Sequence, residues 1–430
     1  MTSSIGPTVK TITLLGLCLF GPFLSDTRGD EPKTATSAEL PFFEALAHQQ
    51  YLTGDWNGYR TRLKNLGINP YFTFTSITFS NTSGGLQTGS RWGGLIDFGS
   101  DFSFEKMWGW AGASLHLNFH WWQGDQPSEE LIGLLGFDQL SGLEASNAFR
   151  VYHLYFQQTF QGGDYLFKIG QINLGADFEV SKYAGLFLNN SFGDMPSRAA
   201  ASNAPVYPLA APGVYFEAKP WREWAVRTGV YTSDAGQDVA SNIGFDWKIG
   251  GPEGFSILME VAVDTKFLGL PGTYKLGGMY NTAKLERLGS SATVKGNVDI
   301  YIVVDQALLL NDENKPRLGA FVRIGTNPLK DRTQIDLHAG AGLNWFGPIP
   351  GRSEDTLGIA VSYNRFTDAF VNSAPPDGPQ ISKEETILEM TYQAVLTPWL
   401  TLQPDLQFVF DPVLSGRDAY VIMVQGVVNF

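Results

Sequence analysis

Two short patterns in the sequence have the residue types and spacing of catalytic or metal-binding motifs. Ser103 and Lys106 fit the SxxK pattern of penicillin-recognising enzymes, which needs the two side chains one helical turn apart. Here they fall where an expected strand ends in a turn, so a chance match is favoured. His116 and His120 have the spacing of a zinc-binding HExxH helix, but in a strand they lie about 13 Å apart. Neither pattern predicts an enzyme or a metal site.

The glycine-rich stretch HAGAGLNWFG at 338–347 has some of the character of a phosphate-binding loop. Its glycines alternate within an expected strand and no helix follows. They are better explained as leaving space on one face of that strand. A hydrolase would need a serine and a histidine close together, and the chain has five histidines in all. We therefore expect no enzyme, no cofactor and no metal.

The first residues have the layout of a secretory leader. Lys10 precedes an apolar run from Ile12 to Leu24, which is too short to span a bilayer as a helix. A polar stretch follows, and we expect cleavage somewhere between about Ser25 and Glu31. The sequence thus predicts a signal peptide over residues 1–29.

Cysteine content, hydropathy and charge exclude several other classes. The only cysteine, Cys18, lies in the leader; LGLC resembles a lipoprotein signal, but Leu17 is bulky where a small residue is expected. The mature chain then has no disulfide and no Cys-based metal site. Past the leader no stretch approaches 18 consecutive apolar residues, which excludes a helical membrane protein. The net charge of -13 argues against nucleic acid as a partner, because phosphates require clustered Lys and Arg.

From Asn69 to the end, apolar and polar residues alternate. Before that point, TGDWNGYRTRLKNLG at 53–67 predicts one short amphipathic helix inside a poorly patterned segment, 30–68. In 113–121 every second residue is apolar and the others are Ser, His or Asn. The same period recurs at 152–160, 243–249, 255–264, 298–305, 317–324 and 335–345. Strands of about 9 to 12 residues with one apolar and one polar face suit a tilted bilayer crossing.

Three further features favour a transmembrane barrel over a soluble β-sandwich. Aromatic residues gather near strand ends, where they would form interfacial girdles: Trp121, Trp122, Phe160, Trp221, Trp224, Trp345, Phe346 and Trp399. Tight turns such as QGGD, KPWRE, GGPEG and TPW contrast with long connections at about 122–148, 173–212 and 367–383. The alternation from Tyr420 to Phe430 ends in an aromatic residue and resembles the signal that outer-membrane assembly machinery reads.

The fold class is therefore all-β, a transmembrane antiparallel β-barrel over residues 69–430 that follows a periplasmic segment at 30–68. About seventeen stretches can be interpreted as strands, whereas single-chain bacterial barrels have an even number. The ambiguous part is 233–285, so we expect sixteen strands, with eighteen as the alternative.

Many stretches of the chain, taken in order, resemble the carbohydrate-selective outer-membrane porins of the OprB type. The resemblance runs from about Tyr51 to Phe430. It rests on GDWNGYRTRLKNLGI at 54–68, YAGLFLNNSFG at 183–193, YPLAAPGVYFEAKP at 207–220, VRTGVYTSDAG at 226–236, LPGTYKLGGMYNT at 270–282, GPIPGRSEDTLGIAVSY at 347–363 and LTLQPDLQFVFDP at 400–412. The family implies a sixteen-stranded barrel, passive sugar uptake and a pore narrowed by inward loops and charged side chains. Two features depart from the family's pattern. Asn57 follows Trp56, and the stretch around Lys168 and Gln171 carries little charge.

A pore for sugars must offer hydrogen bonds and yet hold its solute weakly. By the parity of the strands, the side chains expected to face the lumen are His116, Asn118, His120, Asp246, Lys248, Glu260, Asp299, Arg317, Arg323, Asp336 and Asn344. The segment 173–212 is the preferred constriction, because AGLFLNNSFG is too apolar for free solvent, although it could also be a surface lid. A non-selective diffusion porin and a soluble carbohydrate-binding protein remain alternatives. The expected partners are outer-membrane lipid, small carbohydrates and, through Phe430, the assembly machinery.

Overall fold

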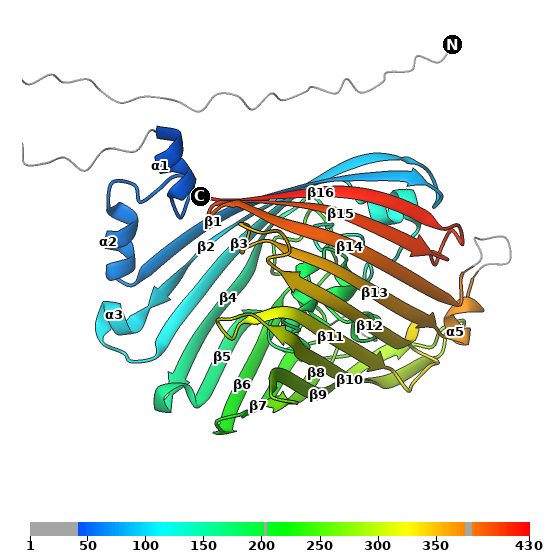
Figure 1. The fold of residues 1–430 in the computed structure, drawn as a ribbon. Coiled ribbons are helices and arrows are strands. Elements are labelled where there is room, and N and C mark those ends of the chain that lie inside the picture. The colour runs from blue at the N-terminus through cyan, green and yellow to red at the C-terminus, as the bar shows by residue number, and fades with distance from the viewer. Residues whose placement is uncertain (1–41, 202–203, 375–380) are drawn as a thin grey trace, which may run out of the picture.

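The fold is a closed β-barrel, seen in a computed structural model that describes residues 42–201, 204–374 and 381–430 (Figure 1). Sixteen antiparallel strands within these ranges pair in sequence order, and β1 closes the barrel against β16. The expected strand number is confirmed, whereas the predicted leader at 1–29, with Cys18, lies outside the described residues. The strands are β1 Ile68–Ser83, β2 Gly89–Ser103, β3 Ala113–Gly124, β4 Phe149–Phe160, β5 Tyr165–Ile172, β6 Ala211–Trp221, β7 Trp224–Thr232, β8 Phe255–Phe267, β9 Leu270–Glu286, β10 Thr293–Leu310, β11 Pro316–Thr326, β12 Ile335–Phe346, β13 Thr356–Phe366, β14 Glu384–Thr397, β15 Leu400–Phe410 and β16 Ala419–Asn429.

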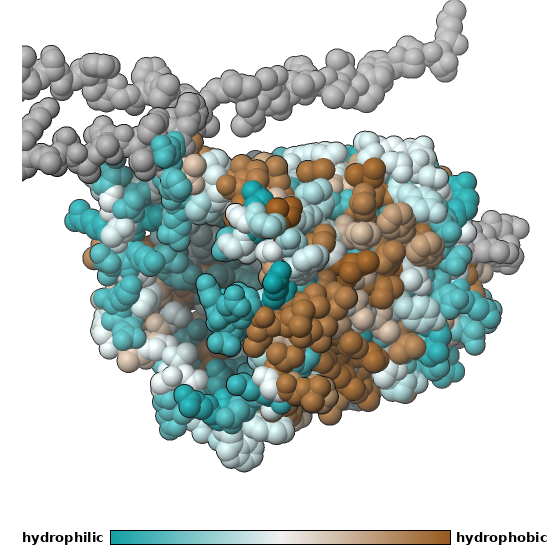
Figure 2. All heavy atoms as spheres, in the orientation of Figure 1, coloured by the Kyte–Doolittle hydropathy of each residue, from teal (hydrophilic) through white to brown (hydrophobic). Residues whose placement is uncertain are grey.

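The barrel is apolar outside and polar inside, as the two-residue period predicts. On β8, Ile257 and Met259 are 39% and 59% exposed, whereas Ser256 and Glu260 on either side of them are 0% and 1% exposed. The exposed apolar side chains form a band across the strands, with hydrophilic residues on both sides of it (Figure 2). Lipid can cover this band, because an apolar surface of this extent is otherwise costly in water.

Part of the predicted aromatic girdle is present on the outer surface. Trp121, Trp221, Trp224 and Trp345 are all at least 41% exposed near strand ends. Trp122 is instead 1% exposed, because the residue that follows Trp121 in a strand must point the other way. It therefore lies in the lumen and not in the girdle.

The two ends of the barrel differ in the length of their connections. One end has short turns, such as 222–223, 268–269 and 398–399, and also carries the N-terminal helices α1 Phe42–His48 and α2 Tyr59–Asn65. The other end has the long connections 125–148, 173–210 and 233–254. In bacterial barrels the short turns face the periplasm and the long loops face the exterior.

The predicted helix at 53–67 is shorter in the structure, and α1 lies in a region where no element was expected. Trp56, Asn57 and Gly58 all have positive φ angles, which delay the start of α2 until Tyr59. The segment is attached to the barrel where the first and last strands meet. Arg60 lies over the ring of Tyr51, and its Nη2 donates to the carbonyl oxygen of Phe430 at 2.7 Å.

The predicted strand at 243–249 was wrong, and it accounts for the surplus segment in the strand count. Gly244 and Gly250 have φ angles of 105° and 76°, which an extended strand does not accept. The segment belongs to the 233–254 connection, whose Ile243 carbonyl accepts a hydrogen bond from the Val151 amide near the start of β4. Its apolar residues Ile243, Phe245 and Ile249 are 45 to 62% exposed, so the alternation marks a connection with one exposed apolar face and not a transmembrane strand. GGPEG is likewise part of this long connection and not a tight turn.

Among the described residues, no helix is long and apolar enough to cross a membrane.

Candidate functional site: a segment that narrows the lumen

The connection between β5 and β6 folds into the barrel, and we call its residues 173–201 and 204–210 the inward segment. It carries short helical turns, including α4 Pro196–Ala199, and most of its residues are buried. Its apolar side chains Tyr183, Phe187 and Phe192 pack against Phe321 of β11 and Ala360 of β13. This packing explains why the AGLFLNNSFG core is too apolar for a solvated loop.

Glycines in the wall allow the inward segment to approach closely. A Cβ atom on Gly319 of β11 would lie 2.5 Å from the ring of Tyr183. A Cβ atom on Gly358 of β13 would lie 2.6 Å from the side chain of Leu186. Side chains at these positions would push the segment off the wall, so the glycines determine how deeply it sits.

Three wall carboxylates hold the inward segment through its backbone amides. Glu260 of β8 accepts from the Glu179 amide at 3.0 Å. Asp305 of β10 accepts from the amides of Lys182 and Tyr183 at 3.0 and 3.2 Å, and also from the Ser181 hydroxyl. Glu389 of β14 accepts from the amides of Leu188 and Asn189 at 2.6 and 3.0 Å. Hydrogen bonds to charged groups are the stronger kind, so these contacts fix the segment across three different strands.

A buried arginine organises the interior of the segment. Arg198 is 0% exposed; its Nε donates to Glu179 at 2.5 Å and its Nη2 to Asp194 at 2.6 Å. Burial opposes its charge, but Glu179 and Asp194 outweigh that effect and raise the pKa of Arg198. Asp194 also accepts from the Tyr207 amide at 3.1 Å. The cation therefore joins distant parts of the inward segment to one another.

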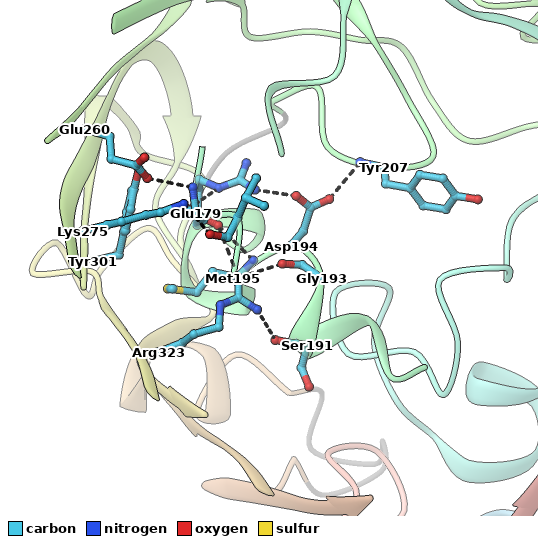
Figure 3. Close-up of polar contacts among 12 residues, drawn as sticks. Glu179, Ser191, Gly193, Asp194, Met195, Tyr207, Glu260, Lys275, Tyr301 and Arg323 are labelled. Atoms are coloured by element: carbon cyan, nitrogen blue, oxygen red, sulfur yellow. Dashed lines mark hydrogen bonds and ion pairs between the residues drawn. The ribbon is translucent and has the colours of Figure 1, made fainter. Parts of the chain in front are cut away.

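Arg323 of β11 joins this cluster from the wall (Figure 3). Its two terminal nitrogens donate to the carbonyl oxygens of Ser191 and Gly193 at 3.2 and 2.7 Å. On the other side of the cluster, Lys275 of β9 donates to the carbonyl oxygen of Val180 at 2.5 Å. The cationic residues of the barrel wall thus donate to backbone carbonyl oxygens of the inward segment, while the anionic residues accept from its backbone amides.

A second segment, residues 125–148 between β3 and β4, also folds inward and meets the first. The amides of Gly142 and Asn190 donate across the junction to the carbonyls of Leu188 and Gln139, at 3.2 and 2.9 Å. Glu144 holds this second segment together, because its carboxylate accepts from the Ser128 amide and hydroxyl at 2.8 and 2.6 Å. Burial raises the pKa of Glu144 to about 7.

A pocket with both apolar and polar lining residues remains open against the inward segment. It has a volume of 340 Å³, and its lining includes Tyr152 of β4 together with Asn173, Asn190, Asp194 and Tyr207. The pocket therefore combines two aromatic rings with amide and carboxylate groups. Tyr152 is 8% exposed and its ring already stacks on His120 and His153, so Tyr207 is the ring that can meet the apolar face of a sugar, while the amide and carboxylate groups exchange hydrogen bonds with its hydroxyls.

The wall of β2 and β3 adds a row of polar groups. His116 Nδ1 lies 2.7 Å from Asp101, and the Asn118 amide donates to Asp97 at 2.5 Å. His120 is 3.5 Å from Asp97 and stacks on the ring of Tyr152, with centroids 4.2 Å apart. The histidine and asparagine side chains predicted on β3 therefore do lie on the lumen side.

The other predicted lumen residues lie in different parts of the barrel. Asn344 donates to the carbonyl oxygen of Tyr183 at 2.9 Å, so it contacts the inward segment as Glu260 and Arg323 do. Asp299 of β10 is fully buried beneath the segment, and Arg317 is exposed at the short-turn end of β11. Their roles in transport stay predictions.

Three predicted residues do not line the lumen wall. Asp246 and Lys248 belong to the 233–254 connection, where Lys248 lies 3.4 Å from Asp234. Asp336 lies at a bulge in β12 and pairs with Arg365, which by its place in β13 points outward with Ile359 and Val361. A bulge adds one residue and so reverses the parity on which the expectation relied.

Several residues that build the constriction were missed. Asp305 and Glu389 occupy inward positions of their strands, so parity could have found them. Glu179, Asp194 and Arg198 lie in a segment without any repeat period, and no local signal predicts their contacts.

The barrel, its apolar band and its narrowed lumen define a porin, a channel of the outer membrane. The family model "Carbohydrate-selective porin, OprB family" matches residues 87–430, and the chain belongs to this family. It is thus a carbohydrate-selective channel of the outer membrane and not an enzyme.

Individual relatives are distant but cover nearly the whole chain. Porin B of Pseudomonas aeruginosa is 24% identical over 405 residues, which are 85% of this chain and 87% of that protein. The provisionally named porin QuiX of Acinetobacter baylyi is 23% identical over 418 residues, 89% of this chain and 93% of that one. The high-pH structure of Pseudomonas putida OprB has a TM-score of 0.81 at 20% identity, covering 89% of this chain and 99% of that one. At that identity the structural match supports the fold alone.

Proposed function

We propose that small neutral sugars diffuse passively along the exposed face of the inward segment and contact the 340 Å³ pocket on the way. The observation that carries the proposal is the combination in this pocket of the Tyr207 ring with Asn173, Asn190 and Asp194. A sugar carries many hydroxyls and no charge, so weak hydrogen bonds and ring stacking can guide it without trapping it.

We extend the proposal to the polar row on β2 and β3. His116, Asn118 and His120, together with Asp97 and Asp101, offer donors and acceptors close to Tyr152. Sugar hydroxyls can both donate and accept, so such a mixed row suits them better than a wall of one charge.

The proposal can be tested by filling the passage without disturbing its anchors. Val180 is 45% exposed and lines the pocket, and only its backbone carbonyl holds Lys275. Val180→Trp should lower the rate of glucose-driven liposome swelling severalfold, because the larger ring obstructs the path. Val239→Trp is the matched control, since Val239 is 39% exposed in the 233–254 connection and does not line this pocket. Equal rates for both variants and the parent protein would refute the proposed path.

We also propose that the strand ending in Phe430 is read by the outer-membrane assembly machinery. The ring of Phe430 packs edge-on against Phe72 with centroids 5.1 Å apart. Phe430→Ala should lower the yield of assembled barrel in cells while leaving the conductance of refolded protein unchanged. A normal cellular yield would contradict this role.

A further inference from the structure

The inward segment borders a second cavity of the lumen, which we call the short-turn cavity. It has a volume of about 600 Å³ and is lined by Lys182 and Tyr183 of the segment, by residues at the short-turn ends of β8 to β11, and by Glu223 in the turn between β6 and β7. The 340 Å³ pocket is lined instead by Val180 and Ser181 of the same segment. The two cavities share no lining residue, so the inward segment passes between them.

The wall of the short-turn cavity is the lumen face of β8, β9 and β10. Asp264, Thr273 and Asp305 are direct neighbours across these three strands, and the register around them is free of bulges. Asp305 contacts the inward segment, so its neighbours on this face also point into the lumen. The Thr273 hydroxyl donates to Asp264 at 2.6 Å. Lys266 lies two residues beyond Asp264 on the same strand and therefore shares its face.

Four charged side chains line the short-turn cavity without pairing with one another. Lys182 comes from the inward segment, Glu223 from the turn, and Asp264 and Lys266 from β8. None of the four forms an ion pair with any residue of the described ranges. Asp305 also lines the cavity, but its carboxylate is already occupied by amides of the inward segment. The two positive and two negative charges offset one another, and most of their hydrogen-bonding capacity is free for a ligand.

Lys182 has a fixed place at the edge of this cavity. Asp305 accepts from the backbone amides of Lys182 and Tyr183 at 3.0 and 3.2 Å. The ammonium group of Lys182 lies 5.6 Å from the centre of the Tyr183 ring, and the residue is exposed. A solute that leaves the constriction at the short-turn end therefore meets this cation.

The chemistry of the short-turn cavity suits a neutral solute with many hydroxyls. A carboxylate only accepts hydrogen bonds and an ammonium group only donates them, whereas each hydroxyl of a sugar does both. Neighbouring hydroxyls of one ring can therefore donate to a carboxylate and accept from an ammonium group on the other side of the cavity. Hydrogen bonds to charged groups are the stronger kind. Because the charges offset one another, the cavity gives neither anions nor cations an advantage.

We propose that the short-turn cavity is a second sugar-binding site, in which Asp264 and Glu223 accept from sugar hydroxyls while Lys182 and Lys266 donate to them. The inference rests on the proposed passage of sugars and adds a site in series with the 340 Å³ pocket. Binding at several weak sites lets a channel capture a solute at one end and still release it at the other. The inward segment between the two sites is then the barrier that a sugar crosses from one to the next.

The experiment measures how glucose reduces the ion current of the full barrel in planar bilayers, with glucose added to one side at a time. Lys182→Met/Asp264→Asn removes one charge of each sign and keeps the net charge. It should raise the glucose concentration needed for half of the effect about tenfold from one side only, because hydrogen bonds to charged groups are lost. Asparagine can still accept from the Thr273 hydroxyl, so the wall keeps its structure.

Arg222→Met/Asp164→Asn is the matched control. Both residues are exposed at the short-turn end and line neither cavity, and the variant makes the same change in charge. It should leave the glucose titration unchanged from both sides. Val180→Trp fills the other pocket and should weaken the titration from the opposite side only. Failure of the 340 Å³ pocket and failure of the short-turn cavity therefore give different patterns.

Three results would overturn the proposal. The first is an unchanged titration of Lys182→Met/Asp264→Asn from both sides. The second is an equal weakening from both sides, which would assign these residues to the docking of the inward segment. Free glutamine, a zwitterion of similar size, is the second probe and should reduce the current less than glucose does at equal concentration. The third is a stronger effect of glutamine, which would assign the cavity to solutes that carry both charges.

Discussion

The buried Arg198 provides the sharpest test of how the lumen is narrowed. Arg198→Met keeps most of the side-chain volume but leaves Glu179 and Asp194 without their shared cation. Arg198 is 0% exposed, and breaking a buried ion pair on one side typically costs about 3–5 kcal/mol. The barrel strands do not depend on this contact. The substitution therefore destabilises the docked state of the inward segment relative to an undocked one.

A loss of about 3–5 kcal/mol raises the ratio of undocked to docked segment by roughly 150- to 4,000-fold. We therefore expect Arg198→Met to give higher single-channel conductance and more open-channel noise in planar bilayers. Hydrogen exchange of residues 176–200 should rise, while heat-stable migration of the folded barrel on gels stays normal. Glu179→Gln/Arg198→Met should recover part of the parent behaviour, because one uncompensated charge is removed.

The matched control is Arg91→Met, which removes a partly exposed pair with Glu130 at 2.8 Å. Such pairs contribute about 1 kcal/mol or less, so conductance should stay at the parent value. If Arg198→Met kept the parent conductance, noise and exchange, the inward segment would not depend on this cluster and the reasoning would be refuted.

Three further predictions concern docking, pH and the lipid surface. Gly319→Val should displace the Tyr183 ring and raise conductance, and a normal conductance would show that the wall glycine is not needed for close approach. Because burial raises the pKa of Glu144 to about 7, above its ordinary 4.5, the docked second segment is most stable below pH 4.5 and weakens as pH rises through 7. Hydrogen exchange of residues 128–144, corrected for its intrinsic rate, should therefore rise over that range, and Glu144→Gln should reduce the dependence to the part that comes from Asp138, whose pKa burial raises to about 6. Met259→Arg on the outer face should destabilise the refolded barrel by about 2–4 kcal/mol in urea titrations, whereas the inward-facing Thr75→Arg should cost far less.

Strand alternation predicted the barrel and part of the constriction. Glu260, Arg323 and Asn344 were expected inward because a strand presents every second residue to one face, and all three contact the inward segment. The same rule failed for Asp336, where a bulge changes the parity, and for 243–249, where a connection lies along the barrel without crossing the membrane. Alternation indicates which face of a segment meets water, but it does not show whether the segment crosses the membrane.

The interior of the inward segment could not be predicted. Glu179 and Arg198 are 19 residues apart in a stretch without regular structure, and only the folded path of the chain brings them within 2.5 Å. The sequence did indicate that this segment is too apolar to be solvated, which located the constriction but not its contacts.

The most direct test of the central claim is liposome swelling with three solutes of matched size: glucose, gluconate and glucosamine. A lumen that guides sugars by hydrogen bonds and ring stacking should pass glucose fastest, and Val180→Trp should lower the glucose rate most. Equal rates for all three solutes, with no effect of Val180→Trp on any of them, would contradict the account.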